Sequence, residues 1–338
     1  MKRLFFVIMG TAALFCACSS SNIETALQEA FGVTAHASAP VFLGCRTISA
    51  HEIRFQFSLP VTLLSARFSP DMEVESVING TDVAITVRES AAAGEQVTAD
   101  ILVEDEHKNT LNVLTLFRIR NDRLPSFVIT EIRSETSKPK GEFVEINMLS
   151  DGNLGALRMF AATNGMDAPV FECEPVEVEE GEYVVIHLRT YEDGSVNEYG
   201  TNRAEAAAAD AQSTARDFWL SDAAEKLRKT DAVFFLDQDD AVLDAVLFSA
   251  NGTWGSKTFS DNVANAAQLL EEHGAWTTAS GGLLSPDDAF SSASTTATRT
   301  ICRKEGAADT NTAADWYITV SSGATPGKPN NTGKYVPK

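Results

Sequence analysis

The chain has 338 residues and a formal net charge of −20, from 27 Lys and Arg against 47 Asp and Glu. Charged residues make up 22% and hydrophobic residues 44% of it, a composition typical of globular rather than disordered proteins. The acidic balance argues against a nucleic-acid partner, because that affinity comes largely from Lys and Arg neutralising phosphates. Five Cys are too few for a disulfide scaffold, and no apolar run reaches the roughly 17–25 residues of a membrane-spanning helix.

The N-terminal residues have the pattern of an export signal. A basic start precedes the apolar segment Leu4–Phe15, which suits the core of a signal peptide and is too short to cross a bilayer. Ala17-Cys18 and three serines follow. A small residue before a Cys, at the end of an apolar segment, resembles the lipobox of bacterial lipoproteins, although Phe15 stands where Leu is usual.

This resemblance implies that residues 1–17 are removed and that Cys18 carries a thioether-linked lipid. It implies a bacterial envelope location, with the outer membrane or the cell surface favoured over the inner membrane. The alternative is an ordinary secretory signal with incidental Cys residues. Loss of the two basic residues takes the net charge from −20 to −22, and an anionic leaflet repels such a body, so the acyl chains would have to hold it.

Residues 18–38 predict a flexible tether, because they are rich in Ser, Ala and Thr and carry little charge. The segment Ile23–Phe31 within them could form a short helix, but no convincing cap precedes it.

Residues 39–122 predict an immunoglobulin-like β-sandwich. Apolar and polar residues alternate in several short runs, and the hairpin signal Asn79-Gly80 separates two of them. The closing runs, 97–103 and 111–119, resemble the last hairpin of bacterial immunoglobulin-like modules that lack the Cys–Trp–Cys core of antibody domains. The apolar residues that share one face of their runs are Ile53, Phe55, Phe57, Val83, Ile85, Val87, Val97, Ala99, Ile101 and Val103.

A second group of motifs follows the polar hinge at 121–125. In chain order the main ones are Phe127-Val128-Ile129-Thr130-Glu131-Ile132, Glu142-Phe143-Val144-Glu145-Ile146-Asn147, Gly181-Glu182-Tyr183-Val184-Val185-Ile186, the hairpin 231–248 with Asp244 in its second strand, and Thr325-Pro326-Gly327-Lys328-Pro329-Asn330. In this order they resemble the lamin tail domain over residues 125–330, with a tail at 331–338. The resemblance implies a second immunoglobulin-like sandwich, and hence an all-β fold with two sandwiches in tandem.

Two inserts lengthen this second region, near 202–228 and 256–297. In the second, apolar residues near helical spacing predict a helix over 261–273, with Gly274 as its terminator. A long Ser/Thr/Gly loop is expected from 280 to 297. The inserts could carry function or cover a strand edge, and the sequence does not decide between these roles.

Metal and cofactor chemistry has little support. None of the five His falls in a His-x-x-x-His pattern and there is no Cys-x-x-Cys, so no zinc site and no cofactor are expected. The acidic turn 237–240 lacks the Gly and Glu of an EF-hand, with Val242 and Phe248 in their places. A solvated hairpin turn is therefore expected, and a looser calcium site is the alternative.

Two groups of residues invite a stronger interpretation. Cys173 and Cys302 fall in one predicted domain and could form a disulfide in an exported chain, while buried free thiols, Cys45 included, are the alternative. Glu131, Glu142 and Glu145 are acids within strands, but the last two have opposite parity and face opposite sides. We therefore expect solvent-facing acids and no catalytic residues.

The sequence favours a non-catalytic, lipid-anchored envelope protein that presents its β-sandwiches for protein or carbohydrate binding or for envelope organisation. One alternative is an accessory subunit that docks a separate nuclease or hydrolase, because bacterial lamin tail domains often accompany such domains. The other is a metal-assisted hydrolase with dispersed acids. No fold by itself selects among these functions.

Overall fold

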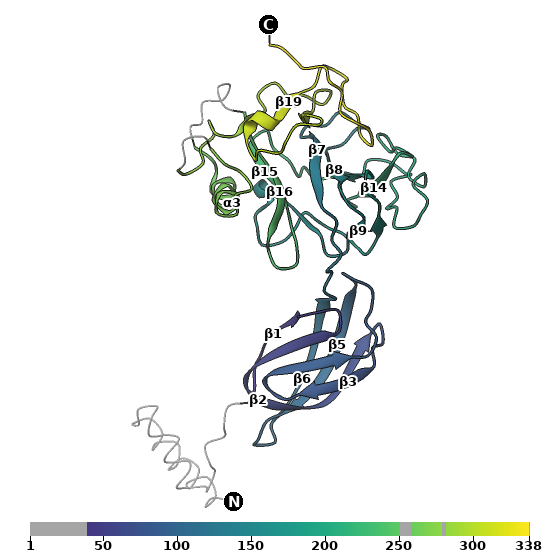
Figure 1. Cartoon of the computed structure of the whole chain (residues 1–338), viewed down its shortest axis with the longest axis vertical. Helices are drawn as coiled ribbons and strands as arrows, with labels where there is room; N and C mark the ends of the chain where they lie inside the picture. The colour runs from purple at the N-terminus through teal and green to yellow at the C-terminus, as the bar shows by residue number, and fades with distance from the viewer. Residues whose placement is uncertain (1–38, 251–257, 279–281, 338) are drawn as a thin grey trace, which may run out of the picture.

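The computed structural model describes residues 39–250, 258–278 and 282–337. These residues are mostly β, with several sheets and one α-helix. The predicted signal 1–17, the lipidation site Cys18 and the tether 18–38, with its short helix, fall outside them. Figure 1 shows two units, strands β1–β6 and strands β7–β19, joined by one segment.

The first unit is a six-stranded sheet built around one very long strand, β2. Its Glu52–Gln56 portion pairs with β4 and its Thr62–Ser69 portion pairs with β5. Pro60 lies between them, where the register shifts, because proline has no N–H to donate to a ladder. The strands are β1 (Phe42–Thr47), β2 (Glu52–Ser69), β3 (Val74–Ile78), β4 (Gly80–Val87), β5 (Gln96–Glu104) and β6 (Thr110–Arg118).

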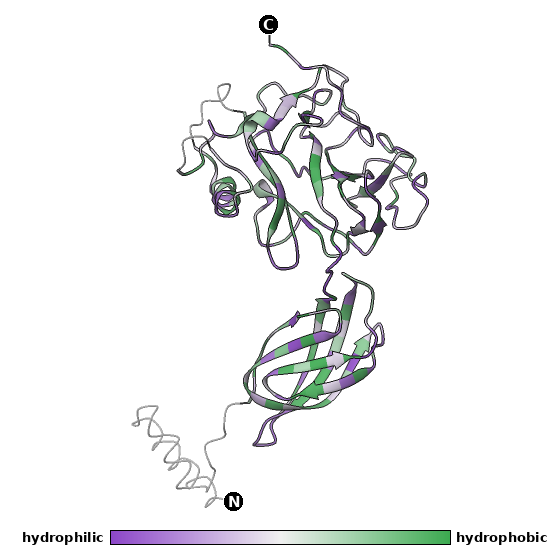
Figure 2. Ribbon diagram, in the orientation of Figure 1, coloured by the Kyte–Doolittle hydropathy of each residue, from purple (hydrophilic) through white to green (hydrophobic). Residues whose placement is uncertain are grey.

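The hydrophobic alternation predicted for this unit is confirmed by its burial. The ten core residues expected from the sequence are 0–2% exposed and belong to one hydrophobic cluster. Their polar neighbours along each strand face outward, so the strands of the first unit alternate in colour in Figure 2. The predicted hairpin is also present, because β3 and β4 pair antiparallel on either side of Asn79.

The second unit places a larger core between two sheets. A five-stranded sheet has the order β11-β10-β15-β16-β17, and a six-stranded sheet has the order β14-β13-β8-β7-β18-β19. The strands are β7 (Phe127–Arg133), β8 (Phe143–Met148), β9 (Gly152–Asn153), β10 (Arg158–Ala161), β11 (Phe171–Glu172), β12 (Glu177–Val178), β13 (Tyr183–His187), β14 (Ala215–Trp219), β15 (Asp231–Leu236), β16 (Val242–Ser249), β17 (Phe290–Ser291), β18 (Ile301–Arg303) and β19 (Trp316–Ile318).

Both inserts are structural parts of this second unit. The insert at 202–228 supplies β14, which pairs in parallel with β13 and covers its edge. The predicted helix is α3 (Asp261–Glu272), which buries Val263 and Leu270 in the core and is followed by Gly274 at φ +66°. The stretch expected as a loop from 280 to 297 contains the short strand β17. Edge covering by the first insert is therefore observed.

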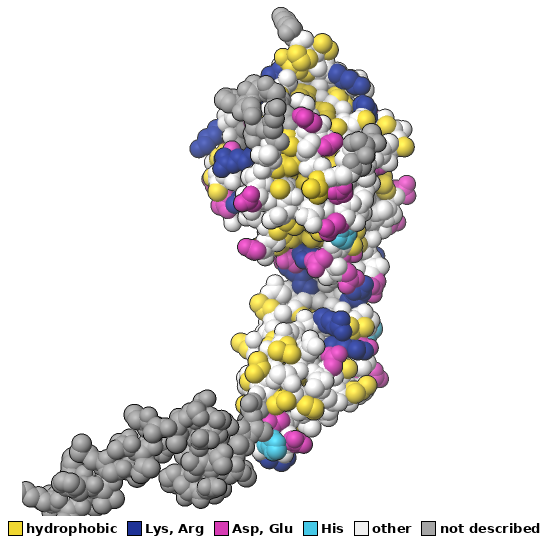
Figure 3. Space-filling model, turned by 90° about the vertical axis from the view of Figure 1, so that its left-hand side faces the viewer, with side chains coloured by type: hydrophobic (Ala, Val, Ile, Leu, Met, Phe, Trp, Pro, Cys, Tyr) yellow, Lys and Arg dark blue, Asp and Glu magenta, His cyan; other side chains and the backbone are white. Residues whose placement is uncertain are grey.

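The segment between the units is packed rather than free. The Asn121 side chain is buried and its Nδ2 donates to the carbonyls of Asn153 and Gly155, 2.8 Å away in each case. At the same junction the backbones meet at Gly94 and Gly155, where a Cβ on Gly155 would lie 2.6 Å from the Ala93 carbonyl. Charged side chains gather at this waist in Figure 3, including the pairs Arg120–Asp239 and Arg123–Glu177.

The Gly94–Gly155 contact predicts that Gly155→Ala opens the junction. Overpacking of this kind costs roughly 1–3 kcal/mol, so we expect tryptic cleavage at Arg120 and Arg123 to accelerate about tenfold. Gly200→Ala is the matched control, because a Cβ there has only one neighbour within 4 Å, the Asn202 nitrogen at 4.0 Å. Equal cleavage rates in the two variants would show that the close approach does not hold the units together.

Candidate functional site

The acids expected to face solvent are buried, which corrects the sequence interpretation. Glu131, Glu142 and Glu145 are each 0% exposed. From their sequence parity, Glu142 and Glu145 were expected to face opposite sides, and their carboxylates do have different partners. Glu142 accepts from Arg189 Nε at 2.6 Å and from the Leu227 N–H at 3.1 Å. The period-two pattern predicted solvent on one face of these strands, but loops and the C-terminal segment cover that face.

Glu131 and Glu145 instead form a cross-strand pair on β7 and β8. Thr300 donates to one oxygen of Glu131, and the Thr325 N–H donates to the other at 2.9 Å. The Thr130 hydroxyl donates to Glu145 at 2.6 Å, and the Gly327 N–H donates to its second oxygen at 2.5 Å. All four carboxylate oxygens are therefore hydrogen-bonded.

This pair fixes the C-terminal segment 325–330 onto the sheet. Asn330 adds to it by donating from Nδ2 to the carbonyls of Thr130 and Arg303, at 2.9 and 3.0 Å. Gly327 has φ +74°, and a Cβ there would lie 2.8 Å from the Ala215 Cβ. The strand acids and the Thr-Pro-Gly-x-Pro-Asn end, far apart in sequence, thus make one structural site.

The two carboxylates also perturb each other. Burial, followed by the neighbouring Glu131 carboxylate, raises the pKa of Glu145 well above its ordinary value. Burial raises the pKa of Glu131 as well, against hydrogen bonds from Thr300 and Thr325 that lower it. Two like charges in a dry site disfavour double ionisation, so the pair holds a proton at pH values where exposed carboxyls have lost theirs.

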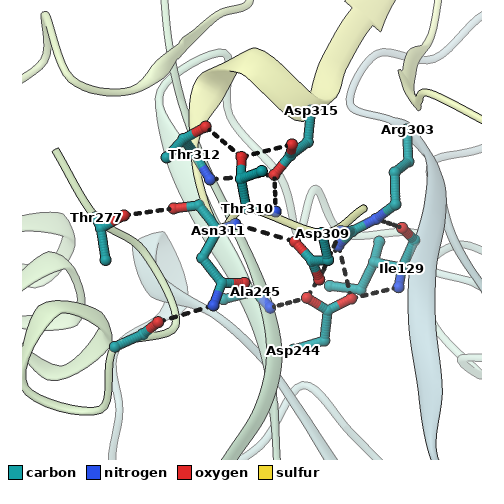
Figure 4. A network of polar contacts seen from close by, with 11 residues as sticks. Ile129, Asp244, Ala245, Thr277, Arg303, Asp309, Thr310, Asn311, Thr312 and Asp315 are labelled. Atoms are coloured by element: carbon teal, nitrogen blue, oxygen red, sulfur yellow. Dashed lines mark hydrogen bonds and ion pairs between the residues drawn. The ribbon is translucent and has the colours of Figure 1, made fainter. Parts of the chain in front are cut away.

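A second buried acid, Asp244, links the two sheets (Figure 4). It lies on β16, yet it accepts the backbone N–H of Ile129 on β7 at 2.6 Å. Arg303 on β18 contacts both Asp244 oxygens, at 3.0 and 2.8 Å, and donates from Nε to the Ile129 carbonyl at 2.7 Å. The ion pair therefore supplies both backbone hydrogen bonds of Ile129. The β7–β18 ladder pairs Ile132 with Ile301 and Glu131 with Cys302 and ends before it reaches Ile129.

The network around Arg303 extends to the loop after β18. Asp309 pairs with Arg303 Nη1 at 2.8 Å, and the guanidinium lies 4.6 Å from the centre of the Trp316 ring. Burial raises the pKa of Asp244 to about 6, and the Arg303 charge opposes this shift. In Figure 4 the Asp315 carboxylate accepts the backbone N–H groups of Thr310 and Thr312, which lie further along the same loop.

A third polar cluster holds the first insert. His187 on β13 lies 2.7 Å from Asp217 on β14, and its ring stacks on Trp219 with centroids 3.7 Å apart. Glu198 accepts the Asp217 N–H at 2.8 Å, and Arg216 pairs with Glu182 at 2.9 Å. These groups resemble catalytic side chains in type, and their bonds tie strand β14 of the insert to β13 and to the segment around Glu198.

The remaining predicted site residues lie apart. Cys173 and Cys302 are free thiols, so they do not form the disulfide considered from the sequence. Cys173 lies in the main core, whereas Cys302 lies beside Thr300 in the six-stranded sheet. Cys45 is free and half-buried. In the 237–240 turn, Asp239 and Asp240 pair with Arg120 and Arg158, and the described residues contain no group of three or more metal-ligating side chains.

Two hollows have the size of ligand sites. The junction groove, about 660 Å³, lies between the units and is lined by Arg46, Arg118, Arg120 and Arg158 with Glu172 and Asp239. The outer-face cleft, about 310 Å³, lies over the six-stranded sheet. It is lined by Val128, Asn147 and Tyr183 from β7, β8 and β13, by Arg303 at the end of β18, and by Glu305 and Asn330 beyond it. Small-molecule sites typically measure roughly 300–1,000 Å³.

Sequence reasoning missed the outer-face cleft and the Glu131–Glu145 pair. The available signal was that Phe127–Arg133 and Phe143–Met148 each place an acid among apolar residues, and the structure buries both faces of these strands. A strand with acids on a buried face needs donors from elsewhere in the chain, and those donors lie about 180 to 195 residues further on.

Residues 125–318 match the family model TP_1001_2nd, described as a protein second domain. The comparison with curated proteins found no match. In residues 39–250, 258–278 and 282–337, no helix has the length and apolar character needed to pass through a bilayer.

The sheet-to-sheet ion pair predicts a large cost for Asp244→Asn. The substitution leaves the Arg303 guanidinium buried with only Asp309 as a counter-charge, and breaking a buried pair costs about 3–5 kcal/mol. Asp309→Asn is the matched control, since Asp309 is 34% exposed, and should cost about 1 kcal/mol or less. Urea denaturation measures both, and equal losses would contradict the role given to Asp244.

The carboxylate pair predicts an unusual pH dependence. A carboxyl whose folded-state pKa is raised stabilises the protein at low pH, and this contribution is lost as the pH rises from about 4.5 through the folded-state pKa. In Glu145→Gln the Gly327 N–H keeps an acceptor and the Thr130 hydroxyl can accept instead of donate. We expect its loss of unfolding free energy between pH 5 and pH 8 to be smaller than that of wild type.

The exposed Glu180 provides the control for this measurement, because Glu180→Gln removes the same charge at the surface. Denaturant titrations at pH 5 and pH 8 compare the three proteins. If Glu145→Gln and Glu180→Gln change the pH profile equally, the effect is one of net charge and the paired carboxyls are not its source.

Proposed function

The chain belongs to the TP_1001_2nd family, and we propose that it is a lipid-anchored protein of a bacterial envelope that binds ligands without catalysis. Lipidation at Cys18 would hold it to the membrane, and residues 18–38 would separate the anchor from the first unit. We further propose that the first unit is an immunoglobulin-like sandwich and the second a lamin tail domain. The proposal rests on the sequence motifs together with the way this structure uses its acids.

One observation carries the choice of binding over catalysis. The buried acids that could act as general acids or bases, Glu131, Glu142, Glu145 and Asp244, each accept hydrogen bonds from backbone N–H groups and side chains that hold strands and loops together. A catalytic carboxyl must reach a substrate proton, whereas these are enclosed by their own chain. The hollows, in contrast, present polar groups to the outside.

The arrangement along the chain fits presentation of a distal binding unit. The described chain begins in the lower half of the first unit in Figure 1, and the second unit follows at the opposite end. In a protein anchored before residue 39, the second unit would therefore be the one farther along the chain from the membrane. Its polar outer-face cleft would then be available to soluble or surface-bound partners.

The accessory-subunit function is supported by a separate observation. Strand β6 pairs with β5 and bears Leu114 and Leu116, which are 73% and 59% exposed. Leu114 and Leu116 are two residues apart and so share one face of the strand, which offers a protein partner an apolar contact. Under this alternative, a separate enzyme would dock on the first unit.

Lipidation is tested by Cys18→Ala in the intact cell. The wild-type protein is expected in the membrane fraction with a mass increased by the acyl groups, and the variant is expected to lose that mass and to become soluble or remain unprocessed. Cys16→Ala is the matched control and should behave as wild type, because Cys16 would leave with the signal. Membrane retention of an unacylated Cys18→Ala protein would refute the anchor.

A further inference from the structure

We propose that the outer-face cleft binds a neutral sugar unit of an envelope or extracellular polysaccharide. The cleft lies on the side of the six-stranded sheet that faces away from the main core, and its floor is a row across three strands. Tyr183 on β13 is the cross-strand partner of Asn147 on β8, which is the partner of Val128 on β7. The loop after β18 and Asn330 form its other wall.

The charge of the cleft favours an uncharged ligand. Arg303 and Lys304 are balanced by Glu305 and Asp309, so the lining has no net formal charge, although the whole chain carries −20. Arg303 is in addition occupied by Asp244 and Asp309, and Lys304 donates to the Ala314 carbonyl. The cationic groups are therefore committed, so an anionic ligand gains little from entering.

The polar groups that remain are of the kind that hydroxyl-rich ligands use. Asn147 donates from Nδ2 to the carbonyls of Gly181 and Glu182, which leaves its amide oxygen as an acceptor. Glu305 accepts the Asn330 N–H with one carboxylate oxygen at 2.8 Å, which leaves the other. These two oxygens can accept from hydroxyl groups, and the Tyr183 hydroxyl can both donate and accept.

Tyr183 also supplies the apolar surface that a sugar ring needs. Its ring is half-buried against the small outer-face cluster of Phe143, Val185 and Ala215. Burial, followed by the carboxylates of Glu305 and Glu145, raises the pKa of Tyr183 to about 12, so its hydroxyl stays protonated and able to donate. Ligand sites that combine apolar and aromatic contact with a few placed polar groups are the common type.

The junction groove does not offer an equivalent site, although it is larger. Arg118 pairs with Glu172 and Glu174, and Arg120 pairs with Asp122 and Asp239. Most of its guanidinium donors are thus used in joining the two units. The sugar proposal rests on the proposed binding function and locates it in the second unit.

The test uses the full chain, extracted in a detergent without a sugar headgroup, and isothermal titration with cellotriose, maltotriose and tri-N-acetylchitotriose. Trigalacturonic acid is the charged comparison. We expect at least one neutral trisaccharide to bind with a Kd of about 1 mM or tighter and to bind better than the acid. Absence of neutral-sugar binding at about tenfold this concentration, or a preference for the acid, would overturn the proposal.

Variants place the binding in the cleft. Tyr183→Ala should weaken binding at least tenfold, and Glu305→Gln and Tyr183→Phe roughly two- to tenfold, as expected for loss of one hydrogen bond. Tyr335→Ala, where the ring contacts Arg299 outside the cleft, should leave the Kd unchanged. If Tyr183→Ala fails to fold, as judged by its Tm, the other two variants decide. Equal affinity in wild type and in both of them would overturn the assignment.

The two tests separate the sugar proposal from the proposed anchor. If the chain is lipidated at Cys18 but binds no neutral sugar, only the sugar proposal is refuted. If the chain binds the sugar but is not lipidated, only the membrane anchor is refuted.

Discussion

The second unit depends on one buried ion pair, Asp244 with Arg303. Its two sheets come together at β7, where Ile129 has no ladder partner on the β18 side, and an unpaired backbone N–H and C=O in a dry core would each cost roughly 1–3 kcal/mol. Asp244 reaches from one sheet and Arg303 from the other, and together they satisfy both groups. Their own charges are compensated by the same contact.

The same principle recurs through the second unit with different residues. Glu142, Glu145, Glu131 and Asp231 are each buried and each accept several hydrogen bonds from segments distant in sequence. Acids in the strands thus serve as fixed acceptors for loops that have no regular secondary structure to satisfy them. This use explains why a chain with long irregular inserts still has a closed core.

The first unit was largely predictable from its sequence, whereas much of the second was not. In the first unit one face of each strand is solvated, so alternation alone identified Ile53, Phe55 and Phe57 as core. In the second unit β7 and β8 are covered on both faces. The covering groups include residues 325–330, and no local pattern shows which distant segment will lie on a strand. Helix α3 was predictable because its apolar spacing is local.

The position of the final residues has a consequence for biogenesis. Thr325, Gly327 and Asn330 bond to groups on β7 and β8 that precede them by 182 to 200 residues. Contacts of such long sequence separation form late. During synthesis the first unit has its whole core available early, whereas the second must wait until residues 325–330 have been made. Until then Glu131 and Glu145 lack their backbone donors, and a chain interrupted before residue 325 would leave the second unit unfinished.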